Sequence, residues 1–445
     1  MKKLISIMLT IFLSLSLFTT VCISKTEAKA ALSYRYDKNN HTLYVNGRGK
    51  MPKYSAQWLN DWSVIGNVEK IVVESGLTSI ADYAFSDDID GNSGTGRNGL
   101  NNVKEIVLPN TVKTIGKDAF SFLFKLKKIN IPKSVTKVGE RAFADCRSLN
   151  NVTIHSSLKR LSNEMFYDCD KLRNIKIEKG VKIIGKDAFS CSGIRNIKLP
   201  STITKIESGA FNISEIKKLA LPKKIKSISS FCYTYCRNLK KLTIPKRIKK
   251  IGEFAFSGCY NLKSVKLPKS IKKIPKAAFN ECEKLTKISF TKKLKSIGPY
   301  AFERCKSLKK FTIPKRVKSI GQGTFSECFK LEKITIPKSV KSIGFEAFAD
   351  CKKLKDINIP NSVTKISKNA FYGCKSLKTI TIPKSVTTLG KHFFGFTQKK
   401  TNKKNEYGET VYEYVKINGY TVKGYKGTVA EKYAIDSGLS FIALD

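Results

Sequence analysis

The sequence predicts an α/β repeat solenoid, a right-handed coil of about fourteen units of 23 residues with a cap at each end. Three observations predict it. The pair Ala-Phe, or a close variant, recurs every 22 or 23 residues through most of the chain. Each interval contains a short alternating apolar pattern that is usually followed by proline, and most intervals carry glycine in one column. A fixed period in the twenties is the signature of a solenoid.

The first 30 residues have the pattern of a signal peptide that is removed on export. Lys2 and Lys3 precede an apolar run, and Ala28 and Ala30 supply the small residues that a cleavage site needs. We expect cleavage between Ala30 and Ala31, and therefore a secreted or cell-surface protein.

A lipoprotein signal at Cys22 is the alternative, but the preceding Thr19, Thr20 and Val21 lack the leucine and the small residue that such a site prefers. No later apolar run approaches the roughly 20 residues that a membrane-spanning helix requires. After removal of the signal, we expect no transmembrane segment.

The repeat is defined by one aromatic column. Its members are Phe120, Phe143, Phe166, Phe189, Phe211, Tyr233, Phe256, Phe279, Phe302, Phe325, Phe348, Phe371 and Phe394. Phe85 precedes them by one period plus an insertion within residues 86–100. The repeats therefore occupy residues 68–397.

The unit from Leu239 to Leu262 shows how one coil is built. Leu242 and Ile244 alternate with Thr243, as inward and outward residues of a short strand do, and Pro245 ends that strand. The later apolar residues are three to four apart and predict a helical turn or two on the core. Gly252 occupies the glycine column, where we expect it to let the chain turn. One unit cannot bury its own apolar edge, so the units must stack, with each strand beside its copy.

The motif running from Leu331 to Cys351 resembles the BspA-type leucine-rich repeat of bacterial surface proteins. The resemblance covers about residues 68–397 and implies a leucine-rich-repeat-like coil. It also implies attachment to host or neighbouring cells and to extracellular matrix proteins. Departures from the pattern affect single columns: Ser162, Glu207, Ser229, Pro275 and Ser367 replace glycine, and Tyr233 replaces phenylalanine.

The flanks also resemble that family. Residues 31–67 are similar to its N-terminal cap, with a strand at residues 43–47 and an aromatic cover from Trp58 and Trp62. Residues 398–445 are expected to form a loop and a C-terminal cap. Gln398 to Tyr407 is rich in lysine and asparagine and is expected to be an exposed loop; a strand, a short helix beginning near Thr428 and a last strand should follow.

The charge is extreme, with 83 Lys and Arg against 35 Asp and Glu. In an exported protein such a surface attracts anionic wall polymers, anionic lipid, sulfated glycans or free nucleic acid. The alternative is a lysine-rich genome that places lysine at every solvated site.

Two lysine columns follow the strand and become ladders when the units stack. Like charges less than one Debye length of about 8 Å apart repel unless the side chains splay or bind anions. Two interpretations of these columns remain open: a stripe that binds polyanions, and ladders of fully solvated side chains. The first column consists of Lys223, Lys246, Lys269, Lys292, Lys315 and Lys338, and the second of Lys249, Lys272, Lys295, Lys318 and Lys341. Nucleic acid is not expected as a specific ligand, because the aromatic residues occupy the core column rather than positions between the lysines.

The outward strand column forms a second candidate surface, since stacking gathers it into one sheet face of the kind on which solenoids bind partners. Its short polar side chains suit a macromolecular ligand and a hydrated face with no ligand equally well. The candidate binding residues are Thr243, Lys266, Ser289, Thr312, Thr335, Asn358 and Thr381, and the column continues towards the N-terminus with Asn130, Thr153, Lys176, Lys198 and Ala220.

Nine of the 12 cysteines fill one repeat column. Column residues share a side-chain direction, which disfavours the roughly 90° dihedral of a disulfide, so buried free thiols are expected. Cys232 and Cys236 could instead approach each other or a metal ion, and Asp87, Asp88 and Asp90 in the insertion faintly suggest a calcium loop; a surface loop fits these acids better.

The chain shows no motif of a known enzyme. His41, His155 and His392 lie in the N-terminal cap, one coil and the last coil, and no nucleophile elbow, phosphate loop or zinc-protease helix is present. We expect no enzymatic activity, cofactor or metal. The sequence predicts a surface or secreted adhesion protein whose partner is an extracellular protein or an anionic polymer, such as a wall polymer or a sulfated glycan. A structural protein held on anionic wall polymers by charge is the alternative.

Overall fold

The computed structural model describes residues 32–52, 66–86, 99–407 and 410–444. The expected signal peptide with Ala30 and Ala31, Cys22, the aromatic cover from Trp58 and Trp62, and the acidic residues of the insertion lie outside them. The chain divides into two compact units, Met1–Ile203 and Thr204–Asp445. Turns of about 23 residues, about 15 along the chain, form a β-solenoid, which confirms the predicted fold class.

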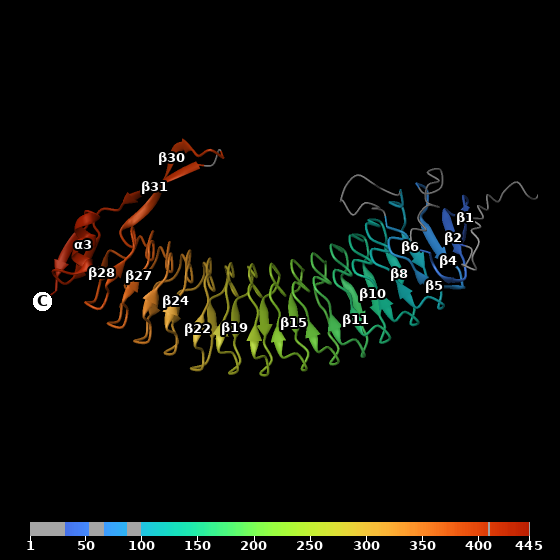
Figure 1. Cartoon of the computed structure of the whole chain (residues 1–445), viewed down its shortest axis with the longest axis horizontal. Helices are drawn as coiled ribbons and strands as arrows, with labels where there is room; N and C mark the ends of the chain where they lie inside the picture. The colour runs from blue at the N-terminus through green and yellow to red at the C-terminus, as the bar shows by residue number, and fades with distance from the viewer. Residues whose placement is uncertain (1–31, 53–65, 87–98, 408–409, 445) are drawn as a thin grey trace, which may run out of the picture. The chain divides into compact units, whose positions relative to one another are not determined.

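The first unit stacks two series of parallel strands (Figure 1). The sheet β1-β2-β4-β6-β8-β10-β12 begins with an antiparallel pair, Ser33 opposite Asn46, and continues with parallel pairs. The sheet β3-β5-β7-β9 and the pair β11-β13 hold the shorter second strands. The strands are β1 (Ser33–Asp37), β2 (Thr42–Asn46), β3 (Gly49–Lys50), β4 (Lys70–Val73), β5 (Leu77–Ile80), β6 (Glu105–Val107), β7 (Thr114–Ile115), β8 (Lys128–Asn130), β9 (Lys137–Val138), β10 (Asn151–Ile154), β11 (Arg160–Leu161), β12 (Asn174–Ile177) and β13 (Ile183–Ile184).

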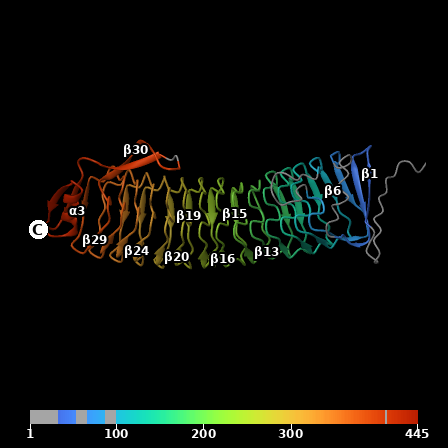
Figure 2. The ribbon, with the colours of Figure 1, turned by 45° about the horizontal axis from the view of Figure 1, so that its top comes forward.

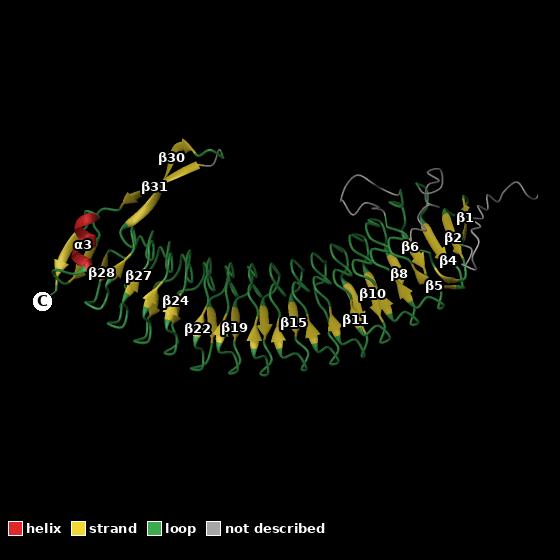
Figure 3. Cartoon of the chain, viewed as in Figure 1, coloured by secondary structure: helices red, strands yellow, loops and turns green. Residues whose placement is uncertain are grey.

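The second unit repeats the same pattern (Figure 3). Its first strands are β15 (Lys218–Ala220), β17 (Lys241–Thr243), β19 (Ser264–Lys266), β21 (Lys287–Ser289), β23 (Lys310–Thr312), β25 (Lys333–Thr335) and β28 (Thr379–Thr381). Its second strands are β14 (Lys205–Ile206), β16 (Ser227–Ile228), β18 (Lys250–Ile251), β20 (Lys273–Ile274), β22 (Ser296–Ile297), β24 (Ser319–Ile320), β26 (Ser342–Ile343), β27 (Lys365–Ile366) and β29 (Thr388–Leu389). Copies pair in register, as Lys241 does with Ser264.

The strands alternate as predicted, because period-two side chains point to opposite faces. In β23 the side chain of Thr312 is exposed, whereas Phe311 and the following Ile313 are buried. The aromatic column forms the centre of the core in both units. Within unit two the rings of Phe256 and Phe279 stack with their centroids 5.7 Å apart.

The predicted helical turns after the second strand are absent from the described repeats. Two residues of this segment have positive φ in most coils, for example Phe254 (φ 56) and Gly258 (φ 68), and a right-handed helix cannot contain them. The backbone bonds instead to the next coil: the Phe256 N–H donates to Ala278 O at 3.0 Å. We call this segment, which lies between each second strand and the following cysteine, the turn edge.

The glycine column is explained by close approach. Gly252 does not have a positive φ, and a Cβ placed on it would lie 2.3 Å from the backbone nitrogen of Ser230 in the preceding coil. The expected reason, a turn that needs glycine's conformational freedom, is therefore replaced by a steric one.

The segment expected as an exposed loop forms a hairpin instead. Strand β30 (Phe396–Lys404) pairs antiparallel with β31 (Thr410–Lys416) and extends away from the stacked coils of its unit (Figure 2). Its base is held by Tyr414, whose ring stacks on His392 at 4.1 Å and whose hydroxyl accepts from Asn369 Nδ2 at 3.0 Å. These tertiary contacts outweigh the weak strand propensity of the lysine- and asparagine-rich sequence.

The expected strand, helix and strand of the ending are present. Strand β32 (Thr421–Gly424) pairs parallel with β28, and β33 (Ser440–Ala443) pairs parallel with β32. Between them lies α3 (Val429–Asp436), with Thr428 at its N-cap. In the part of the chain that the structure describes, no helix is long and apolar enough to span a membrane.

Candidate binding surfaces

The strand face of unit two presents the predicted column to solvent. The side chains of Lys266, Ser289, Thr312, Thr335, Asn358 and Thr381 are all exposed. Thr243 lies in β17 in register with Lys266. Parallel pairing places Thr243, Lys266 and Ser289 one strand step apart, about 4.8 Å, and does the same for Thr312 and Thr335. The column is therefore brought together as expected, although its strands do not form one continuous sheet.

The strand face of unit one carries the N-terminal part of the same column. Asn130 and Lys176 are exposed and Thr153 is half-buried. With Asn151 and Asn174 they line a hollow of about 410 Å³ over β8, β10 and β12. Amide and hydroxyl groups dominate the lining of this hollow.

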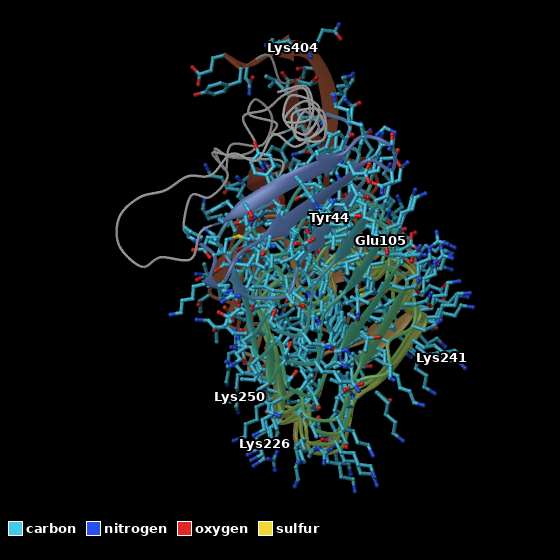
Figure 4. All side chains as sticks on the ribbon, turned by 90° about the vertical axis from the view of Figure 1, so that its right-hand side faces the viewer. Tyr44, Glu105, Lys226, Lys241, Lys250 and Lys404 are labelled. Atoms are coloured by element: carbon cyan, nitrogen blue, oxygen red, sulfur yellow. The ribbon has the colours of Figure 1, made fainter. Side chains whose placement is uncertain are left out.

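The two lysine columns lie together in unit two, and we call their eleven members the basic edge. All eleven, Lys223, Lys246, Lys269, Lys292, Lys315, Lys338, Lys249, Lys272, Lys295, Lys318 and Lys341, are exposed. Figure 4 shows three lysines of unit two that are not members of the basic edge. Lys226 and Lys250 lie on one side of the coil and Lys241 on another, and all three point outward.

The basic edge lacks internal neutralisation. Among the described residues, none of its eleven ammonium groups forms an ion pair. Between β18 and β20 four lysines line a hollow of about 760 Å³ together with Glu253; two of them, Lys249 and Lys272, belong to the basic edge. Uncompensated lysines one strand step apart produce a strongly positive surface, because the spacing is shorter than the Debye length of about 8 Å.

Acidic residues gather instead along the turn edge, where arginines pair with them. Arg304 bridges Glu281 at 3.0 Å and Glu327 at 3.1 Å, one coil before and one coil after it. In unit one Arg141 joins Asp118 at 3.0 Å and Glu164 at 3.1 Å in the same way. The cross-section of a coil is therefore electrostatically polarised.

Burial raises the pKa of carboxyl groups on the turn edge. The pKa of Asp145 rises to about 6, with a further contribution from Asp168. Burial also raises the pKa of Glu303 and Asp350 in unit two. These shifts accompany ion pairs and packing between coils. Asp145 and Asp350 each precede a buried cysteine, but burial and the neighbouring carboxylate raise the pKa of Cys146 and Cys351, so neither acid activates a thiol.

The cysteine column consists of free thiols, as predicted. None of the eleven described cysteines forms a disulfide; ten are buried and Cys191 is partly exposed. Cys232 and Cys236 form no disulfide. Burial raises the pKa of the Cys236 thiol to about 12, so it is protonated and unreactive at neutral pH.

The described residues contain no group of three or more His, Cys, Asp and Glu side chains that could hold a metal ion. His155 contacts Glu178 at 3.3 Å, and His41 contacts the Tyr36 hydroxyl at 3.1 Å. His392 packs against the hairpin. Each of these three histidines therefore has a local structural contact.

Comparison with known proteins gives one family model. The model described as the BspA type leucine-rich repeat region matches six copies over residues 97–216, 204–328 and 318–416. None of the curated proteins compared with the chain matches it.

Of three solved structures that the chain resembles, the first two support the fold. A leucine-rich repeat protein from Bacteroides ovatus is 24% identical, with a TM-score of 0.57, and the match covers 83% of this chain and 100% of that one. The pneumococcal vaccine antigen PcpA is 17% identical, with a TM-score of 0.54, covering 96% and 100%. A leucine-rich cell surface protein from Faecalibacterium prausnitzii is 23% identical, with a TM-score of 0.43, covering 84% and 92%.

Proposed function

The chain belongs to the BspA-type leucine-rich repeat family, and on that premise we propose that it is an exported binding protein that presents its strand face to a macromolecule outside the cell. The signal-like first 30 residues support export. The exposed column from Lys266 to Thr381 supports a binding role, since solenoids use such extended surfaces for partners. We infer that adhesion to an extracellular protein is the role of this face, and that the chain acts as a scaffold rather than an enzyme.

The single observation that carries this proposal is the exposed strand column. The separation of charge around the coils of unit two supports a second candidate. Acids pair with arginines on the turn edge, whereas the eleven lysines of the basic edge have no ionic partner among the described residues. A ladder of unpaired like charges costs stability, and an external anion would remove that cost. The basic edge therefore supports a second candidate: a structural protein held on anionic wall polymers or sulfated glycans by charge.

A salt series separates the two functions. The mature chain, residues 31–445, would be passed over immobilised dextran sulfate and over immobilised basement-membrane matrix at increasing sodium chloride. Charge-held binding should fall by at least about tenfold between 50 and 200 mM salt, because several bound counterions are released. A specific protein partner should give saturable matrix binding that persists above 200 mM.

Two charge-matched variants locate the contact. The first replaces Lys249, Lys272, Lys295, Lys318 and Lys341 of the basic edge with glutamine; the second replaces Lys284, Lys330, Lys352, Lys353 and Lys375, which are exposed and lie after the cysteines. Polyanion binding should weaken much more in the first. Equal losses of polyanion binding in the two variants would mean that net charge alone, and not the basic edge, determines binding. If the unmodified chain bound neither dextran sulfate nor the matrix, both functions would be contradicted.

A further inference from the structure

The strand sheet of unit two is interrupted between β21 and β23. The sheet β15-β17-β19-β21 ends there, and β23 pairs only with β25. At the flanking junctions Leu267 N–H donates to Ser289 O at 2.9 Å, and Ile313 N–H donates to Thr335 O at 3.0 Å. Among the described residues no such bond joins Phe290 to Thr312, and none joins Ile244 to Lys266 or Ile336 to Asn358. The interruption is therefore the missing ladder pairing between β21 and β23.

Two aromatic substitutions in the repeat stand at this interruption. Phe290 stands in the column that holds Ile244, Ile313 and Ile336, and the next position, proline in most repeats, is Thr291. In the following coil Phe311 occupies a column of isoleucine, leucine and valine.

The two rings meet with their centroids 5.4 Å apart, and Phe311 also packs edge-on against Phe325 at 4.8 Å. Phe311 is buried, but Phe290 remains half-exposed. Two rings larger than the consensus side chains therefore fill this junction.

The opening is a groove of about 670 Å³ with an apolar floor and a basic rim. Ile288, Phe290 and Phe311 form its floor, and Ser289 and Thr312 of the strand face line it as well. Its rim carries Lys287, Lys292, Lys310, Lys315 and Arg316, all exposed. None of the residues that line the groove is acidic, and none of the five cations forms an ion pair in the described part of the chain.

We propose that this groove docks an extended segment of an acidic polypeptide, with an apolar side chain on Phe290 and carboxylates on the flanking lysines. The lining of the groove favours a peptide over a glycan. The aromatic floor offers burial to an apolar side chain, while five uncompensated cations select carboxylates over ammonium groups.

The proposal rests on the proposed binding function and names the chemistry of its partner. The probe is a fluorescein-labelled nonapeptide of alternating glutamate and valine with a central phenylalanine, titrated with residues 31–445 in a polarisation assay. The double variant Phe290→Ile, Thr291→Pro restores the repeat consensus and removes the aromatic anchor. We expect saturable binding to the unmodified chain and a loss of at least about tenfold in affinity in the variant, as for removal of a central anchor.

Charge is tested with a matched pair of variants. Lys287→Gln with Lys310→Gln should weaken binding several-fold, whereas Lys218→Gln with Lys241→Gln, in the same column over the continuous part of the sheet, should not. A probe with glutamine in place of glutamate should bind weakly. Circular dichroism and the melting temperature establish that each variant is folded.

Several outcomes would overturn the proposal. They are the absence of saturable binding to the unmodified chain, equal binding by the Phe290→Ile, Thr291→Pro variant, and equal binding of the glutamine probe. Dextran sulfate binding with the same dependence on Phe290 would assign the groove to a polyanion instead. The double variant keeps every lysine of the basic edge, so retained dextran sulfate binding with no peptide binding defeats the groove alone and leaves the proposed function standing.

Discussion

The Sγ of Cys328 lies 3.2 Å from the carbonyl oxygen of Phe302, which stands 26 residues earlier in the chain, and donates a hydrogen bond to it. The same bond joins Cys305 to Phe279 at 3.3 Å and Cys351 to Phe325 at 3.2 Å. Each thiol therefore satisfies a backbone acceptor of the preceding coil. The cysteine column joins neighbouring coils by hydrogen bonds as well as by apolar packing.

The buried thiols should resist a thiol reagent in the folded protein. Burial raises the pKa of the Cys236 thiol to about 12 and of Cys328 above its usual range, and the thiolate is the reactive form. With Ellman's reagent at pH 8, we expect Cys191, the partly exposed one, to react slowly and the other described cysteines to react only after unfolding in guanidinium chloride. Rapid native labelling of several thiols would contradict the packing of the column.

Arg304 should stabilise the turn edge modestly. Its guanidinium bridges Glu281 and Glu327, and its side chain is 46% exposed, so solvent screens both pairs. We expect Arg304→Ala to lower the free energy of unfolding by about 0.5–1 kcal/mol, measured by guanidinium denaturation. Arg316→Ala is the control, because Arg316 is exposed and has no ion pair among the described residues; an equal loss there would remove the bridge as the cause.

The sequence predicted the repeat, its strand columns and its core, because each is repeated many times and the period leaves little choice of register. Phe256, Phe279 and Cys328 all take the positions expected of them. The turn edge was predicted wrongly, since spacings of three to four residues are shared by a helix and by a compact turn. Phe254 at φ 56 gives no sequence signal for a left-handed conformation, which stacking between coils imposes.

The candidate surfaces were also predicted only in part. Columns such as Lys249 and Thr312 could be read from the period, and the structure places them on solvent-exposed faces. The groove was missed, although Phe290 and Thr291 break two columns at adjacent positions. A departure from the repeat consensus is the signal that would have found it. The hairpin could not be found from sequence, because the contact of Tyr414 with His392 that anchors it is tertiary.

Thr291→Pro should stabilise unit two. Proline occupies this position in the repeats at Pro245, Pro314 and Pro337, and the Thr291 N–H has no hydrogen bond among the described residues. We expect a gain of about 0.4–1 kcal/mol from reduced entropy of the unfolded chain, seen as a higher melting temperature. Thr286→Pro is the opposing control: the Thr286 N–H donates to Lys263 O at 3.0 Å, so proline there should destabilise.

Asp145 should make stability fall as pH rises. Its side chain is buried beside Arg147 at 3.2 Å, yet burial and the charge of Asp168 raise its pKa from 3.8 to about 6. The folded state therefore binds more protons than the unfolded state between about pH 4 and 6, and the free energy of unfolding decreases across that window and levels off above it.

Asp145→Asn keeps the shape of the side chain and removes the titration. Because one pKa unit corresponds to about 1.4 kcal/mol, the variant should be more stable than the unmodified chain by on the order of 2 kcal/mol at pH 7.5 and equal to it at pH 4. Guanidinium denaturation at both pH values measures the difference. A variant that is less stable at pH 7.5 would mean that the ion pair with Arg147 outweighs the cost of burying the carboxylate.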